Sequence, residues 1–200
     1  MSTQPLRRYT PEEYLALESA ADYKSEYLNG HIYAMAGATP VHTRMLSSTV
    51  RALGNALDPG PCSVYPSELR VRVEETGLYT YPDIAVVCQD EQFSKIGGLD
   101  TLLNPILLIE ILSDSTERYD RGAKFQHYQK IPSLQEYVLI SQNKPLIESY
   151  LRQHTDDQWM LTIANGLETT ILLKSVGVAL SLADVYRRVS FPPELTISDR

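Results

Sequence analysis

The chain has 200 residues, a formal net charge of −7 and a sequence pI near 5.1. Its apolar fraction of 43% and charged fraction of 22% are ordinary for a globular protein, and this length suits a single domain over residues 1–200. The acidic balance argues against a protein that coats nucleic acid non-specifically, because such binding depends on many Lys and Arg contacts to phosphates. An enzyme with a locally positive cleft is not excluded.

Segments that insert into or cross a membrane are not expected. No apolar run approaches the roughly 20 residues that span a bilayer, and the N-terminal MSTQPLRRYT has no hydrophobic stretch behind its basic pair. Cys62 and Cys88 are too few for a disulfide framework and lack the spacing of a metal site. We therefore expect a cytoplasmic protein with two reduced thiols and no membrane partner.

The first third of the chain predicts a helix, a β-hairpin and a second helix. Thr10-Pro11-Glu12-Glu13 combines a Thr N-cap, Pro in the first helical position and a reciprocal Glu, which starts a helix that should run to about Ser19. Asn29-Gly30 between two apolar-containing runs is a hairpin signal. The second helix is predicted from about Pro40 to Leu57, because apolar residues recur there at spacings of four, three and four.

The middle of the chain is rich in strand patterns. Leu69, Val71 and Val73 alternate with charged residues, which predicts a strand with one solvent-facing side. Residues 84–88 predict an apolar strand, and residues 90–104, which include Gly97-Gly98, are expected to form a loop or a short helix.

The stretch PILLIEILSDST, from Pro105 to Thr116, predicts a strand that is buried on both faces and interrupted by Glu110. A carboxylate in that position must meet a cation, a metal or strong hydrogen-bond donors, or else take up a proton. The remaining expected elements are a helix over 116–130, a strand over 136–140, an antiparallel pair over 146–152 and 159–164, and a short helix from 181. The order of elements predicts an α/β fold of the α+β kind, with a mixed sheet flanked by helices.

Three ionisable residues lie at the edges or in the middle of these apolar elements. Asp83 stands just before the strand at 84, Glu110 interrupts the next long strand, and Lys124 shares a helix face with Asp120 and Tyr128 at four-residue spacing. Adjacent strands are about 5 Å apart, so Asp83 and Glu110 on neighbouring strands would lie side by side. Two carboxylates so close repel unless a cation lies between them, and Mg²⁺ or Mn²⁺ suits that role.

An ordered set of motifs resembles the Uma family, a group of proposed restriction endonucleases within the PD-(D/E)XK nuclease superfamily. The resemblance covers roughly residues 9–190, and it implies a restriction-endonuclease-like core with an N-terminal helix and hairpin. The motifs that carry it are Pro82-Asp83, Glu110-Ile111-Leu112-Ser113, the run from Tyr119 to Tyr128, the run from Ile131 to Val138, Glu26-Tyr27-Leu28-Asn29-Gly30 and the helix that contains His42.

The resemblance also implies a function, the hydrolysis of DNA phosphodiester bonds, and often a homodimer. Asp83 and Glu110 would bind Mg²⁺ or Mn²⁺, with the backbone carbonyl of Ile111 completing the shell. The superfamily pattern expects Lys two residues beyond Glu110, where this chain has Leu112. Lys124 would then act as a migrated catalytic lysine, and Glu26 would be an additional acid near the metal.

Simpler interpretations stand beside each of these residues. Asp83 could cap the end of a strand, Glu110 could pair with a core arginine such as Arg70 or Arg72, and Glu26 could be a surface acid beside the hairpin. His42 could contact the site or only pack. For the whole chain, the alternative to a metal-dependent endonuclease is a catalytically inactive nuclease fold kept as a DNA-binding or assembly module, which Leu112 and the acidic balance favour.

Overall fold

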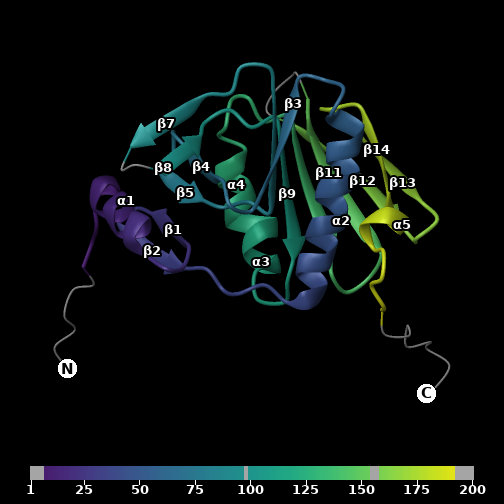
Figure 1. Ribbon diagram of the computed structural model, residues 1–200, viewed down its shortest axis with the longest axis horizontal. Helices are drawn as coiled ribbons and strands as arrows, with labels where there is room; N and C mark the ends of the chain where they lie inside the picture. The colour runs from purple at the N-terminus through teal and green to yellow at the C-terminus, as the bar shows by residue number, and fades with distance from the viewer. Residues whose placement is uncertain (1–6, 97–98, 154–157, 192–200) are drawn as a thin grey trace.

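The computed structural model describes residues 7–96, 99–153 and 158–191. Within these ranges the strands form two six-stranded mixed sheets and a separate hairpin (Figure 1). The predicted α+β class with mixed sheets flanked by helices is confirmed, but the strands divide into two sheets where one was expected. The helices of the described ranges lack the length and apolar character needed to cross a bilayer.

The first sheet contains the N-terminal hairpin and most of the short strands. Its hairpin turns at Asn29-Gly30, as predicted, and both turn residues have positive φ, at 50° and 86°. The strands are, in spatial order, β2 (His31–Ala34), β1 (Ser25–Leu28), β5 (Leu78–Thr80), β4 (Arg70–Val73), β8 (Leu99–Leu102) and β7 (Phe93–Ile96).

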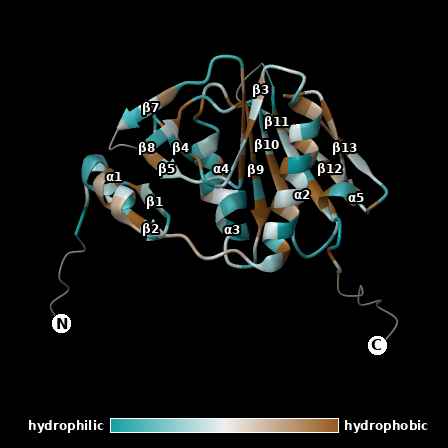
Figure 2. Cartoon of the chain, in the orientation of Figure 1, coloured by the Kyte–Doolittle hydropathy of each residue, from teal (hydrophilic) through white to brown (hydrophobic). Residues whose placement is uncertain are grey.

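The second sheet forms the centre of the molecule and contains the predicted strand around Glu110. That strand, β9, is buried at all six residues and runs parallel to β10 and antiparallel to β6. The strands are, in spatial order, β12 (Trp159–Asn165), β11 (Leu146–Arg152), β10 (Glu136–Ser141), β9 (Leu107–Leu112), β6 (Ile84–Cys88) and β3 (Cys62–Pro66). The central strands stand out as apolar bands in Figure 2.

Helices cover both faces of the second sheet (Figure 1). One face packs against α2, the hairpin of β13 and β14, and the short helix α5, and together these form one apolar core. The other face packs against the first sheet and the helical segment after β9, which forms a second core. The bounds are α1 (Pro11–Ala20), α2 (Pro40–Leu57), α3 (Glu117–Tyr119), η1 (Asp120–Lys124), α4 (Phe125–Tyr128), β13 (Thr170–Leu173), β14 (Val178–Ser181) and α5 (Leu182–Val185).

The two N-terminal helices begin where the sequence predicts. Thr10 and Glu13 form a reciprocal capping box, with Thr10 Oγ1 accepting from the Glu13 amide at 3.2 Å and Glu13 Oε2 accepting from the Thr10 amide at 2.9 Å. The helix predicted over residues 40–57 has exactly these bounds. Its buried side faces the second sheet, which leaves its polar side toward solvent.

Four expectations from the sequence are corrected. Residues 93–102, expected as loop or short helix, form the paired strands β7 and β8, while Gly97-Gly98 lie outside the described residues. Arg70, expected on a solvent-facing side, is 1% exposed because its guanidinium packs over tyrosine rings and donates to Thr101 Oγ1. The segment predicted as one helix over 116–130 is three short pieces, the middle one a π-helix.

The fourth correction concerns the two cysteines, which are joined in a disulfide and are not reduced thiols. Cys62 and Cys88 are cross-strand partners on β3 and β6, with Cα atoms 3.9 Å apart. The sequence does not reveal this pairing, because it depends on the register of two strands that β4 and β5 separate along the chain. The disulfide fastens the edge strand β3 to the strand that follows Asp83.

Candidate active site

The site forms around Glu110, whose side chain is almost completely removed from solvent. Glu110 lies in the middle of β9 and is 4% exposed. Ile84 of β6 pairs with Ile109 of β9 in an antiparallel register, so Asp83, one residue before β6, lies opposite Glu110. The two acids expected to be neighbours therefore lie on adjacent strand segments, at the end of β6 where that strand begins.

Lys124 supplies the positive charge that Glu110 requires. Its Nζ lies 2.9 Å from Glu110 Oε1, 3.3 Å from Glu26 Oε1 and 3.6 Å from Asp120 Oδ1. All four side chains are buried. The alternative partners for Glu110, Arg70 and Arg72, do not form an ion pair with it among the described contacts. Glu26 is likewise a buried member of this cluster and not a surface acid.

Two hydroxyl groups complete the buried polar network. Tyr128 donates its phenolic hydrogen to Glu110 Oε1 at 2.8 Å, and Thr80 donates its hydroxyl hydrogen to Glu26 Oε1. Asp120, Lys124 and Tyr128 thus face the site together, as their spacing predicted. Thr80 is the member that sequence reasoning missed, since a threonine in a short strand carries no signal of its role.

Asp83 is held by a strand of the second sheet and by a side chain from α2. Its Oδ2 accepts the backbone N–H of Ile111 at 2.7 Å and lies 3.1 Å from Nε2 of His42. His42 comes from the first turn of α2, so it contacts the site and does not only pack. Its Nδ1 is buried and has no hydrogen-bond partner among the described residues.

Burial and the charges of neighbouring groups shift the pKa values of several residues in the site. Burial raises the pKa of Glu110 to about 8, and Asp120 and Asp83 add to the rise against the opposing charge of Lys124. For Lys124, burial favours the neutral amine, but the surrounding acids, Glu110 above all, outweigh it and raise its pKa well above the ordinary value. Burial also raises the pKa of Asp120. The cluster therefore holds more carboxyl groups than its single lysine neutralises.

The pKa of His42 responds to the same excess of negative charge. Burial disfavours the charged imidazole, but the hydrogen bond and the charge of Asp83 outweigh it, so the pKa of His42 is raised. An imidazolium at this position would pair with the Asp83 carboxylate and neutralise one acid of the group.

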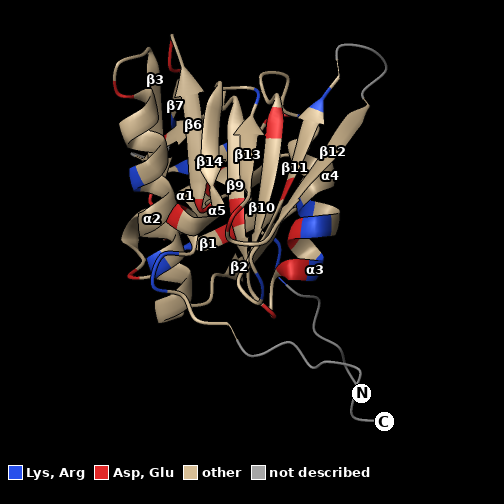
Figure 3. Cartoon of the chain, turned by 90° about the vertical axis from the view of Figure 1, so that its right-hand side faces the viewer, with Lys and Arg blue, Asp and Glu red and all other residues tan. Residues whose placement is uncertain are grey.

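The π-helical turn η1 positions the cationic part of the site. Asp120 and Lys124 are its two ends, and both are buried. Single π-helical turns within helices occur frequently at functional sites. Charged residues of both signs gather on this helical segment beside the second sheet (Figure 3). The residue that replaces the expected lysine, Leu112, instead packs in the apolar core between the two sheets.

The donor chemistry of the cluster suits a hard divalent cation, although the side chains are engaged with one another. Within the described ranges, no three His, Cys, Asp or Glu side chains converge in the manner of a metal site. Glu110 instead faces Lys124, and Asp83 faces Ile111 N–H. The raised pKa of Glu110 and the surplus of carboxyl groups are what a cation would relieve, so the residues present fit such an ion once Glu110 turns from Lys124.

Comparisons with known proteins find relatives over most of the chain. The profile of the Uma2 family, described as "Putative restriction endonuclease", matches residues 11–183. Two proteins of Synechocystis sp. (strain PCC 6803), named "Uncharacterized protein slr1290" and "Uncharacterized protein sll1609", are each 35% identical to this chain. The first match covers 94% of this chain and 96% of the relative, and the second covers 78% and 88%.

A solved structure shows the same fold. It is described as a "putative nuclease belonging to DUF820" from Anabaena variabilis, and it superposes with a TM-score of 0.68. The match covers 83% of this chain and 91% of that protein, at 20% sequence identity. At this identity the likeness concerns the fold alone.

Proposed function

The chain belongs to the Uma2 family, and from this premise we propose that it is a nuclease that hydrolyses DNA phosphodiester bonds with Mg²⁺ or Mn²⁺. The observation that carries the proposal is the convergence of Asp83, Glu110 and Lys124 where the start of β6 lies beside the middle of β9. A buried cluster with an excess of carboxyl groups is costly to a fold that does not use it. A bound divalent cation would neutralise the excess negative charge of these carboxyl groups.

Asp83 and Glu110 would hold the ion, with the backbone carbonyl of Ile111 as a further oxygen ligand. A divalent ion bound there supplies Lewis-acid stabilisation of the charge that develops on the phosphate. His42 is a positioning residue in this scheme, because it holds Asp83 Oδ2 at 3.1 Å. The amide of Ile111 fixes the same oxygen from the strand.

Lys124 would stabilise the negative charge of the reacting phosphate. Its high pKa keeps the ammonium charged at neutral pH, and electrostatic stabilisation of this kind is a large term in phosphoryl transfer. In this structure Glu26 and Asp120 also hold the ammonium, at 3.3 and 3.6 Å. These two acids would therefore orient Lys124 if Glu110 bound the ion, although Lys124 enters from a helix and not from β9.

Plasmid cleavage tests the proposal. Wild-type protein should nick or linearise supercoiled DNA in Mg²⁺ or Mn²⁺ and not in EDTA, and Asp83→Asn and Glu110→Gln should each lower the rate at least 100-fold. Glu75→Gln is the matched control, because it makes the same change in an exposed ion pair with Lys130. Wild-type protein that cuts no faster than the two site variants, over a range of metals and DNA substrates, would refute the nuclease.

The second candidate function is a nuclease fold that binds DNA without cutting it. Leu112 favours this candidate, because the superfamily lysine is absent from β9. Metal-independent binding of DNA, together with equal and negligible cleavage by wild type and Glu110→Gln, would establish it. Activity that depends on Lys124 would exclude it.

Two further parts of the proposal concern assembly and location. A homodimer would bring two sites to the two strands of a duplex, and sedimentation of the protein with and without DNA tests for it. A cytoplasmic location was expected from the sequence, but the Cys62–Cys88 disulfide weighs against a reducing compartment. Labelling of free thiols in protein extracted under acid quench would show which state the chain has in the cell.

A further inference from the structure

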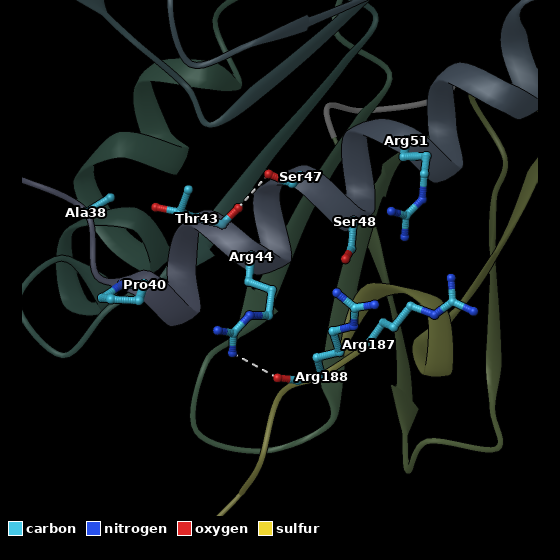
Figure 4. Close-up of a pocket in the computed structure, with 9 residues that line it drawn as sticks. All are labelled: Ala38, Pro40, Thr43, Arg44, Ser47, Ser48, Arg51, Arg187 and Arg188. Atoms are coloured by element: carbon cyan, nitrogen blue, oxygen red, sulfur yellow. Dashed lines mark hydrogen bonds between the residues drawn. The ribbon is translucent and has the colours of Figure 1, made fainter.

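A groove lined by arginine lies on the outer side of α2. Its volume is about 610 Å³, and it runs between α2 and the residues that follow α5. Arg44 and Arg51 enter it from α2, and Arg187 and Arg188 enter it from the other side (Figure 4). We refer to these four residues as the arginine groove.

The residue spacing along α2 places polar side chains on the side of the helix that lines the groove. Arg44, Ser47 and Arg51 recur at intervals of three and four residues, so they share one face of the helix. His42 lies about 200° away from Arg44 around the helix axis, on the side that faces the second sheet. One helix therefore contributes to the candidate active site with one face and to the arginine groove with the other.

The four guanidinium groups lack acidic partners in the part of the chain that the structure describes. None of them belongs to an ion pair there, although acids outnumber bases in the whole chain by 25 to 18. All four residues are exposed. Within the described residues, the guanidinium groups make one hydrogen bond, from Arg44 to the backbone oxygen of Arg188 at 2.9 Å. Four like charges that gather without acidic partners create a positive potential that attracts anions.

The backbone of Arg188 supports the same conclusion. Its φ is 62°, a left-handed conformation that non-glycine residues other than Asn and Asp adopt rarely. Such conformations persist where the surrounding structure holds them, and they cluster at functional sites. Here the conformation places the carbonyl of Arg188 against Arg44 while its side chain lines the groove.

We propose that the arginine groove binds backbone phosphates of the DNA substrate, away from the bond that is cut. This inference rests on the proposed nuclease function and extends it to how the substrate is held. Arg44 and Arg51 are seven residues apart, about 10 Å along the helix, whereas one strand carries a phosphate about every 3.4 Å along the duplex axis. The groove therefore spans several phosphates, and one free phosphate ion cannot contact all four side chains.

Fluorescence anisotropy with a labelled 20-bp DNA duplex in EDTA tests the inference without cleavage. The double variant Arg44→Gln with Arg51→Gln should bind at least tenfold more weakly than wild type at 100 mM KCl. The slope of log affinity against log salt should fall by about 1.8, at about 0.9 for each lost phosphate contact. The control removes the same charge at exposed Lys95 and Lys174, outside the groove.

The outcomes separate the groove from the nuclease. Equal losses in the groove variant and the Lys95/Lys174 control would overturn the inference, because charge alone would then explain binding. Inorganic phosphate that displaces the duplex at concentrations near the dissociation constant of the protein for DNA would also overturn the inference, in favour of a site for a small anion. Wild type that cuts plasmid while the groove variant binds normally would leave the nuclease standing and refute the groove. Groove-dependent binding without any cleavage would support the groove and refute the nuclease.

Discussion

Replacement of Glu110 by glutamine should make the protein increasingly stable relative to wild type as the pH rises. Burial raises the pKa of Glu110 from 4.5 to about 8, so the folded protein retains a proton that the unfolded chain releases. Below pH 4.5 both states are protonated and Glu110 imposes no cost. Between pH 4.5 and 8 the wild type loses stability, and above pH 8 the loss is complete.

The magnitude follows from the same pKa values. Each pH unit of that interval costs the folded state about 1.4 kcal/mol, which gives about 3 kcal/mol at pH 7 and a limit of about 5 kcal/mol above pH 8. Glutamine keeps the shape of the side chain and carries no titrating group, so the variant does not lose this free energy. Tyr128 and Lys124 donate more weakly to an amide oxygen than to a carboxylate, which adds an offset that does not follow the titration of Glu110.

Urea unfolding at pH 5, 6, 7 and 8 in EDTA measures the effect. The quantity is the free energy of unfolding of Glu110→Gln minus that of wild type, in which groups that titrate alike in both proteins cancel. This difference should rise by about 1 kcal/mol per pH unit between pH 5 and 7 and level off above pH 8, and Glu75→Gln shows what the same substitution does in an exposed ion pair outside the cluster. A flat or falling line for Glu110→Gln would refute the reasoning, because Lys124 would then hold Glu110 ionised throughout.

Three other predictions address the lysine, the disulfide and the helix cap. Lys124→Met should lower the single-turnover cleavage rate about 100-fold or more, because it keeps the buried stem and removes the charge, and an unchanged rate would contradict the role of Lys124. Cys62→Ser with Cys88→Ser should lower the free energy of unfolding by about 3–4 kcal/mol, as expected for a cross-link over 26 residues, whereas equal stability in oxidised and reduced wild type would contradict it. Thr10→Ala should cost about 1 kcal/mol in urea unfolding through loss of the α1 cap, and no shift in the midpoint would show that the capping box adds nothing.

The parts of the fold that could be predicted are those with a strong local pattern. The apolar spacing of residues 40–57 marks α2 at both ends, and the unbroken apolar run around Glu110 marks a strand buried on both faces. Glu110 was also informative because it is the one acidic residue within an otherwise apolar strand. The convergence of Lys124 with Glu110 could be anticipated from helical spacing, but the distances could not. That the chain is a single domain stays a prediction.

The parts that could not be predicted depend on contacts between distant segments. Strands β7 and β8 are each four residues long, too short for alternation to distinguish them from loop, and they are stabilised by pairing with each other and with β4. Arg70 alternates like a surface residue and is buried because tyrosines from α1 and β5 surround it. The roles of Asp83, Glu110, Lys124 and Glu26 in catalysis stay predictions for the assays above.

The π-helical turn makes the length of the chain between Asp120 and Lys124 as important as its sequence. A π-helical turn within a helix accommodates more residues than an α-helical turn does, and each residue of an α-helix rotates the next by about 100°. Deletion of Gly122, a small residue within the turn, would restore an α-helical path and rotate either Asp120 or Lys124 away from Glu110. We therefore expect relatives to vary in composition across this segment more readily than in length, and an insertion or deletion here to be as damaging as loss of the lysine.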